Sequence, residues 1–182
     1  MRIIAGRFRG RRLQAPAGVG TRPSSDRLRE ALFNLLAHRP GPPLENALIG
    51  DFFAGTGALG LEALSRGARH AFFVEPARQA LAALRANIAR LGVGGQSTVH
   101  AIDARRLPPA AQALDFLFLD PPYGQGLALP ALERAMAQGW LKSGSLIIVE
   151  AGRDEALDWP AAWRLLDRRV YGQGVVYLVH NF

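Results

Sequence analysis

The 182-residue chain contains no cysteine, which excludes disulfides, iron–sulfur clusters and zinc–thiolate sites. Its four histidines are scattered along the chain without the spacing of metal ligands, so we expect no metal site. No run of about 18 uncharged apolar residues suggests a membrane span. The first residues, Met1-Arg-Ile-Ile-Ala-Gly-Arg, are too polar for a signal peptide. These absences together predict a cytoplasmic, metal-free protein.

Lysine is almost absent as well, because 21 of the 22 basic side chains are arginine. Residues 1–29 hold eight arginines and one acid, whereas residues 30–182 hold 14 basic and 14 acidic side chains. The whole net charge of +7 therefore lies in the first sixth of the chain. Clustered guanidinium groups fit phosphate oxygens and release counterions, so this segment predicts a nucleic-acid-binding face. A solvated basic surface that only increases solubility is the alternative.

The basic segment has features of ordered structure. Residues 2–5 and 11–14 resemble two strands joined by residues 6–10, which predicts a β-hairpin. Ser24 and Ser25 precede a stretch with apolar residues at helical spacing, and Pro- and Gly-rich residues end that helix near position 40. We therefore expect a small hairpin-and-helix extension over residues 1–40 and a main domain over residues 41–182.

The main domain alternates short apolar runs with helical stretches. The runs cover residues 47–53, 70–75, 98–102, 115–119 and 145–149, and Pro76 is expected to be the first residue of a helix that ends at Gly92. This alternation is typical of an α/β fold whose mostly parallel sheet is covered by helices on both faces. Residues 163–171 and 175–180 flank a Gly-Gln-Gly turn and predict an antiparallel C-terminal hairpin. No long exposed apolar helix is evident, so we expect a monomer.

Unusual residues follow the first three strands of this predicted sheet, where ligands of open parallel sheets bind. The first strand leads into Asp51-Phe-Phe-Ala-Gly-Thr-Gly-Ala-Leu-Gly60, whose glycines would let a ligand approach the backbone. Glu75 follows the second strand and could accept hydrogen bonds from ribose hydroxyls. Asp103 follows the third strand and could accept one from an adenine amino group. A nicotinamide dehydrogenase would fit this pattern too.

The fourth strand ends in Asp120-Pro-Pro-Tyr123, a rigid loop that distinguishes between these activities. The Asp120 carboxylate and the Pro121 carbonyl could both accept hydrogen bonds from an exocyclic amino group of a base. Such an amine is a poor nucleophile because its lone pair is delocalised into the ring, and the two acceptors would draw it toward tetrahedral geometry. Tyr123 could stack on a base removed from its own stack. This combination indicates amino-group methylation.

The two loops together resemble those of the class I S-adenosylmethionine-dependent amino-methyltransferases, a Rossmann-like fold. Phe53 stands where the general class favours glycine, a departure typical of the amino-methylating branch. Residues 2–13, 21–34 and 53–68 and the C-terminal hairpin closely resemble the RsmD family, over essentially the whole chain. That family methylates N2 of guanine 966 in 16S ribosomal RNA within the small subunit. The resemblance implies the same reaction here.

The resemblance assigns roles to individual residues of this chain. S-adenosylmethionine is expected to contact residues around the first three strand ends, namely Asp51, Ala54, Gly55, Thr56, Gly57, Glu75, Asp103 and Ala104. The target base is expected to contact Asp120, Pro121, Pro122 and Tyr123. Ribosomal RNA, in the small subunit or an assembly intermediate, is expected to contact Arg7, Arg9, Arg11, Arg12, Arg22, Arg27 and Arg29.

Two other functions remain compatible with these residues. The same loop would accept the amino group of adenine N6 or cytosine N4 in RNA or DNA. A non-enzymatic RNA-binding assembly factor is the other alternative, although the complete set of cofactor and base residues argues against it. The sequence does not distinguish free RNA from an assembled subunit as substrate.

Overall fold

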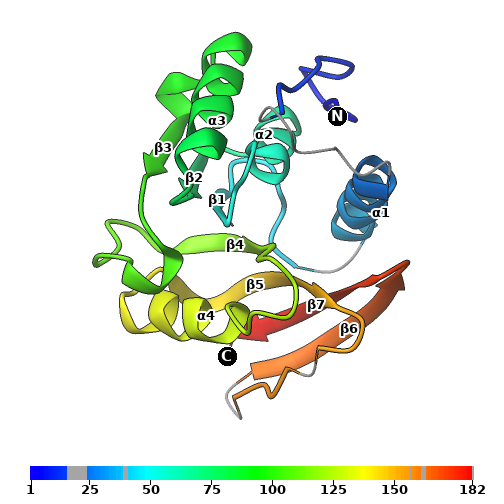
Figure 1. Ribbon diagram of the computed structural model, residues 1–182, viewed down its shortest axis with the longest axis vertical. Coiled ribbons are helices and arrows are strands. Elements are labelled where there is room, and N and C mark those ends of the chain that lie inside the picture. The colour runs from blue at the N-terminus through cyan, green and yellow to red at the C-terminus, as the bar shows by residue number, and fades with distance from the viewer. Residues whose placement is uncertain (16–23, 39–40, 156, 161–162, 182) are drawn as a thin grey trace.

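The computed structural model describes residues 1–15, 24–38, 41–155, 157–160 and 163–181, and its centre is a seven-stranded sheet (Figure 1). The strand order is β3-β2-β1-β4-β5-β7-β6. The first five strands in this order are parallel, and β7 runs antiparallel to both β5 and β6. The strands are β1 (Leu48–Phe52), β2 (His70–Val74), β3 (Ser97–His100), β4 (Leu114–Leu119), β5 (Leu141–Gly152), β6 (Trp163–Tyr171) and β7 (Gly174–Asn181).

Helices cover both faces of the sheet (Figure 1). The helices α1 (Ser24–His38), α2 (Ala58–Ser65) and α3 (Arg78–Leu91) pack on one face, and α4 (Ala128–Ala137) packs on the other. Every residue of β1 is buried because both faces of the sheet are covered. Its side chains alternate between two hydrophobic clusters. Ile49 belongs to the first cluster, which includes α1, α2 and α3, and Leu48 belongs to the second cluster, which includes α4. Two short 3₁₀ turns, η1 (Gly94–Gln96) and η2 (Ala104–Arg106), flank β3.

The architecture agrees with the fold expected from the sequence. The predicted Rossmann-like, mostly parallel sheet with a C-terminal antiparallel hairpin is confirmed. Gly92 ends α3 in a left-handed conformation, as expected. The position of Pro76 was predicted wrongly, because α3 begins at Arg78 with Ala77 as its N-cap. The Glu75 carboxylate accepts a hydrogen bond from the Ala77 amide at 2.8 Å, which shapes the turn before the helix.

Residues 1–15, called the N-terminal arm below, form a looser hairpin than the predicted one. A single antiparallel bridge joins Arg2 to Arg12, and no strand is formed in the arm. The prediction of two strands was wrong because some arm amides bind side chains of α2 instead of a partner strand. The Ile4 and Ala5 amides both donate to the carboxylate of Glu62.

The arm and α1 share a hydrophobic core with the rest of the protein. Ile3 and Leu13 from the arm and Phe33 from α1 are buried in the same cluster as α2 and α3, and the Phe33 ring lies 5.6 Å from that of Phe118 on β4. The boundary at residue 40 stays a prediction. No helix in the described part of the chain is long and apolar enough to cross a membrane.

Candidate functional site

The parallel strands bring the predicted cofactor and base residues to one edge of the sheet. The loops after β1, β2, β3 and β4 all leave from the carboxyl ends of these strands. The order of strands reverses direction between β1 and β4, where open α/β sheets form their ligand-binding crevice. The Asp120 amide donates to the Phe52 carbonyl at 3.5 Å, so the Asp120-Pro-Pro-Tyr123 loop begins directly beside the glycine loop.

The glycine loop after β1 turns sharply into α2. Phe53, Gly55 and Gly57 all have left-handed backbones, with φ of 60°, 55° and 79°. A left-handed backbone is uncommon for a residue with a side chain, which explains why glycine is favoured where this chain has Phe53. A Cβ atom on Gly57 would lie 2.4 Å from Leu84, whereas one on Gly55 would meet nothing within 4 Å. Gly57 is therefore required by packing, and open space lies beside Gly55.

Asp51 is a buried carboxyl beneath this loop. It is only 2% exposed, and its Oδ2 accepts a hydrogen bond from the Gly60 amide at 2.8 Å, near the start of α2. Burial raises the pKa of Asp51 to about 7, with a smaller opposing effect from the Gly60 hydrogen bond and a further increase from the nearby Glu75. The charge of Asp51 therefore changes near neutral pH, and a cation at the loop would favour the ionised form.

Glu75 connects the end of β2 to the glycine loop. It is 8% exposed, and its Oε2 accepts from the Gly55 amide at 2.9 Å while Oε1 accepts from Ala77. Each carboxylate oxygen can accept a second hydrogen bond. The carboxylate therefore orders the loop and keeps acceptor capacity for a ligand. Its predicted role toward ribose stays a prediction.

Asp103 begins the turn η2 after β3. Its carboxylate accepts from the Arg105 amide at 2.8 Å and forms an ion pair with the Arg105 guanidinium at 2.5 Å. The hydrogen bond from the Arg105 side chain is the main reason that the pKa of Asp103 is lowered to about 2. Ala104 is buried in the second cluster, with 1% of the residue exposed, and its predicted contact with the cofactor stays a prediction.

The Asp120-Pro-Pro-Tyr123 loop leaves β4 and is fastened to the end of β5. Asp120 and Pro122 are exposed, Pro121 is buried and Tyr123 is half-buried. The Tyr123 hydroxyl donates to the Glu150 carboxylate, and the Glu155 carboxylate accepts from the Gly124 amide at 3.1 Å. Sequence reasoning missed both glutamates because nothing in their local sequence connects them with a loop about 30 residues earlier.

A cavity of about 590 Å³ borders Tyr123. Its wall comes from the loop after β4, the start of α4, the end of β5 with the residues that follow it, and the β6–β7 turn. The lining residues are Tyr123, Gly124, Gly126, Leu129, Gly152, Arg153, Asp154, Glu155, Leu157 and Gln173. Apolar side chains, carboxylates and one guanidinium thus surround a space of the size that small-ligand sites have.

Among the residues that the structure describes, no three side chains are grouped so that they could hold a metal ion.

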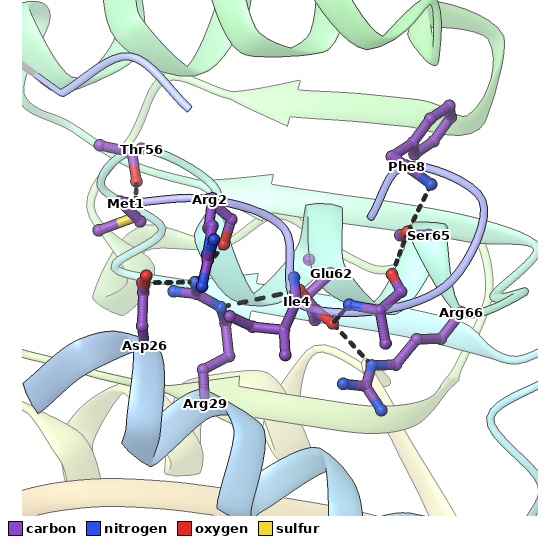
Figure 2. A network of polar contacts seen from close by, with 12 residues as sticks. Met1, Arg2, Ile4, Phe8, Asp26, Arg29, Thr56, Glu62, Ser65 and Arg66 are labelled. Atoms are coloured by element: carbon purple, nitrogen blue, oxygen red, sulfur yellow. Dashed lines mark hydrogen bonds and ion pairs between the residues drawn. The ribbon is translucent and has the colours of Figure 1, made fainter. Parts of the chain in front are cut away.

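The N-terminal arm is attached to α2 through buried polar groups (Figure 2). Glu62 is fully buried, and it accepts from the Ile4 and Ala5 amides at 2.7 and 3.0 Å and from Arg66 Nε at 2.7 Å. Ser65 accepts from the Phe8 amide and donates to the Ala5 carbonyl. These contacts satisfy the buried carboxylate and fix the course of the arm along α2.

Asn87 of α3 links the arm to the glycine loop. The side chain is fully buried and makes three hydrogen bonds: it accepts from the Gln14 amide and donates to the Gln14 and Thr56 carbonyls at 3.0 Å. The Thr56 hydroxyl also donates to the Met1 sulfur, at a distance of 3.5 Å. Figure 2 shows this contact. Sequence reasoning did not identify Asn87, since a single asparagine in an amphipathic helix carries no distinctive signal.

The predicted RNA-contacting arginines fall into different groups. Arg9, Arg11, Arg12 and Arg27 are exposed, and Arg7 is exposed but donates to Gln96 and lies over the Phe8 ring. Arg22 lies outside the described residues.

The prediction for Arg29 was wrong. This side chain is 3% exposed, and its guanidinium donates to Asp26 at 2.9 Å and to the Arg2 carbonyl at 2.6 Å (Figure 2). It joins α1 to the arm inside the protein, where it is inaccessible to RNA.

Comparisons with known proteins identify the family of this chain. The family described as "Conserved hypothetical protein 95" matches residues 1–180. The chain is 40% identical to "Ribosomal RNA small subunit methyltransferase D" of Escherichia coli, covering 100% of this chain and 89% of that protein. It is 36% identical to the protein of the same name from Haemophilus influenzae, covering 94% and 89%.

A solved structure shows the same architecture. A putative methyltransferase from Escherichia coli superposes with a TM-score of 0.87 at 39% identity, covering 100% of this chain and 97% of that chain. The match covers the whole chain, including the arm, the sheet and the C-terminal hairpin. The chain belongs to the family described as "Conserved hypothetical protein 95", the RsmD family of methyltransferases.

Proposed function

We propose that this protein transfers a methyl group from S-adenosylmethionine to the exocyclic N2 amino group of a guanine in 16S ribosomal RNA. The observation that carries the proposal is the placement of the Asp120-Pro-Pro-Tyr123 loop beside the glycine loop at the carboxyl edge of the sheet. Relatives at 40% and 36% identity carry the name "Ribosomal RNA small subunit methyltransferase D", which supports the choice of substrate.

The residues at the first three strand ends fit the parts of the cofactor. S-adenosylmethionine supplies an electrophilic methyl group on a positively charged sulfur. The open space beside Gly55 accommodates a ligand, and Asp51 would place negative charge near its cationic end. Glu75 retains acceptors for ribose hydroxyls, and Asp103 carries a carboxylate at the end of β3 where the adenine would lie.

Asp120 and Pro121 activate the amine in this proposal. The carboxylate and the carbonyl would each accept one N–H of the amino group, which reduces delocalisation of the nitrogen lone pair into the ring. The lone pair then points at the methyl group, and the product nitrogen loses its extra proton after transfer. The reaction therefore needs oriented acceptors, and a base with a raised pKa is unnecessary.

The arm would provide the long-range attraction for RNA. Three of its exposed arginines, Arg9, Arg11 and Arg12, stand on a segment fastened to α2 by Glu62 and Ser65. Phosphate contacts hold an RNA in register without reading its sequence, so target choice would depend on the pocket and the shape of the RNA. We infer a cytoplasmic monomer that acts on the small ribosomal subunit or an assembly intermediate.

Nucleoside analysis tests this function. Small ribosomal subunits and free 16S ribosomal RNA, each from cells lacking this enzyme, are incubated with the protein and isotopically labelled S-adenosylmethionine, then digested to nucleosides for mass spectrometry. We expect labelled N2-methylguanosine. Labelled N6-methyladenosine or N4-methylcytidine would contradict the choice of guanine. RNA binding without any labelled nucleoside would show a binding factor and refute the enzymatic function.

A further inference from the structure

Two glycines at the end of the β5–β7 ladder lie directly beneath Tyr123. Gly152 and Gly174 are cross-strand partners, the last pair in that ladder. A Cβ atom on Gly152 would lie 3.4 Å from Tyr123 Cβ, whereas one on Gly174 would lie 2.7 Å from the Tyr123 hydroxyl oxygen. The tyrosine therefore extends lengthwise across the pair, with its backbone end near Gly152 and its hydroxyl near Gly174.

Space, rather than backbone conformation, favours glycine at position 174, whereas a Cβ atom at position 152 would make an ordinary van der Waals contact with Tyr123. Neither Gly152 nor Gly174 has a left-handed backbone, in contrast to Gly172 in the adjoining turn, whose φ is 60°. Any side chain could adopt the extended conformation of the two residues. A methyl group at position 174 would push the hydroxyl end of the Tyr123 side chain out of its present position, because a Cβ atom 2.7 Å from the hydroxyl oxygen is too close.

Two carboxylates complete this surface. Glu150, two residues before Gly152 on β5, accepts the hydrogen bond of the Tyr123 hydroxyl. Glu155 accepts from the Gly124 amide at 3.1 Å and from the Gly152 amide at 3.3 Å, so it fastens the backbone just after the tyrosine to the end of β5. The ring is thus fixed at both ends, and the cavity of about 590 Å³ borders it.

We propose that Glu150, Gly152 and Gly174 form a seat that holds the Tyr123 ring in the orientation needed to contact the target base, with Glu150 as a positioning residue. This inference rests on the proposed function, in which Tyr123 contacts the base. A ring that is ordered before RNA arrives loses little conformational freedom on binding, so the seat increases productive encounters. Glu150 itself touches neither the base nor the cofactor in this proposal.

The substitutions that test the seat are Glu150→Ala, Glu150→Gln, Gly174→Ala and Tyr123→Phe. Glutamine keeps an acceptor for the hydroxyl, whereas alanine removes it. Gly174→Ala displaces the end of a side chain and leaves the backbone ladder intact, so the protein should fold normally. Gly94→Ala is the matched control, since a Cβ atom there would meet nothing within 4 Å and the backbone is not left-handed.

The main measurement is kcat/KM for small-subunit RNA, with calorimetric S-adenosylmethionine affinity as a second readout. We expect Glu150→Ala and Gly174→Ala each to lower kcat/KM about tenfold or more, the usual effect of losing a hydrogen bond to a charged group. Glu150→Gln should restore most of the activity, cofactor affinity should not change, and Gly94→Ala should match the unmodified protein.

A double-mutant cycle decides whether the effect passes through Tyr123. In the Tyr123→Phe background the hydroxyl is gone, so Glu150→Ala and Gly174→Ala should cause little further loss. Full additivity of the losses would overturn the seat, as would unchanged activity of Glu150→Ala.

The same cycle on thermal stability measures the coupling of Glu150 and Tyr123 without any reaction. If the unmodified protein forms no N2-methylguanosine but the stability cycle shows coupling of Glu150 and Tyr123, the proposed function is refuted and the seat geometry is supported. An active unmodified protein without coupling would refute the seat alone.

Discussion

Replacing Arg9, Arg11 and Arg12 by glutamine should weaken RNA binding and reduce its dependence on salt. These three side chains are exposed on the N-terminal arm, whereas Arg7 is engaged with Gln96 and with the Phe8 ring. The buried contacts that fasten the arm, such as those of Glu62, involve none of the three. The variant therefore removes charge while the arm stays in place.

The magnitude follows from counterion release. Each phosphate contact contributes about 0.7 to the slope of log affinity against log salt for single-stranded nucleic acid and about 0.9 for a duplex. Loss of three contacts should reduce the slope by about 2 to 3. Because residues 30–182 are electrically balanced, losing three of the eight arginines in residues 1–29 lowers the net charge of the whole chain from +7 to +4.

Titration of 16S ribosomal RNA at four or more salt concentrations measures both slopes, and calorimetry with S-adenosylmethionine should show unchanged cofactor affinity. The control variant replaces Arg164, Arg168 and Arg169 on β6, which removes the same formal charge at the far edge of the sheet. Its slope should stay close to that of the unmodified protein. Equal slopes for the arm variant and the unmodified protein would refute the role of the arm.

Three further predictions concern the cofactor and base residues. Glu75→Ala should weaken S-adenosylmethionine binding about tenfold or more in calorimetry, because acceptors for the ribose are lost together with the bond to the Gly55 amide; unchanged affinity would contradict the assignment. Asp120→Ala should lower kcat by about 100-fold with cofactor affinity nearly unchanged, and a wild-type rate would refute its role as an acceptor. Cofactor affinity should rise as pH increases through about 7, because a cationic ligand lowers the raised pKa of Asp51 and its binding releases the Asp51 proton. Asp51→Asn should make cofactor affinity nearly independent of pH in this range. An equally steep dependence on pH in that variant would exclude Asp51 as its source.

The order of elements and the loops that carry the chemistry were predictable from the residues along the chain. Apolar runs alternating with amphipathic helices specify a covered parallel sheet, because both faces of each central strand must be buried. The carboxyl ends of parallel strands meet at one edge, so Gly55, Glu75 and Asp120 were predicted to lie together from their positions after successive strands. These inferences depend on periodicity and on local motifs, both of which are readable along the chain.

Which polar side chains are used inside the protein depends on contacts between segments far apart in the sequence. Arg29 is indistinguishable in sequence from the exposed arginines near it, yet folding buries it against Asp26 and the Arg2 carbonyl. Glu62 and Glu150 likewise find partners 58 and 27 residues away, in the arm and in the loop after β4. A buried charge needs a partner of opposite charge or a hydrogen-bonding group. Which group becomes the partner depends on how distant segments pack, and the local sequence does not contain that information.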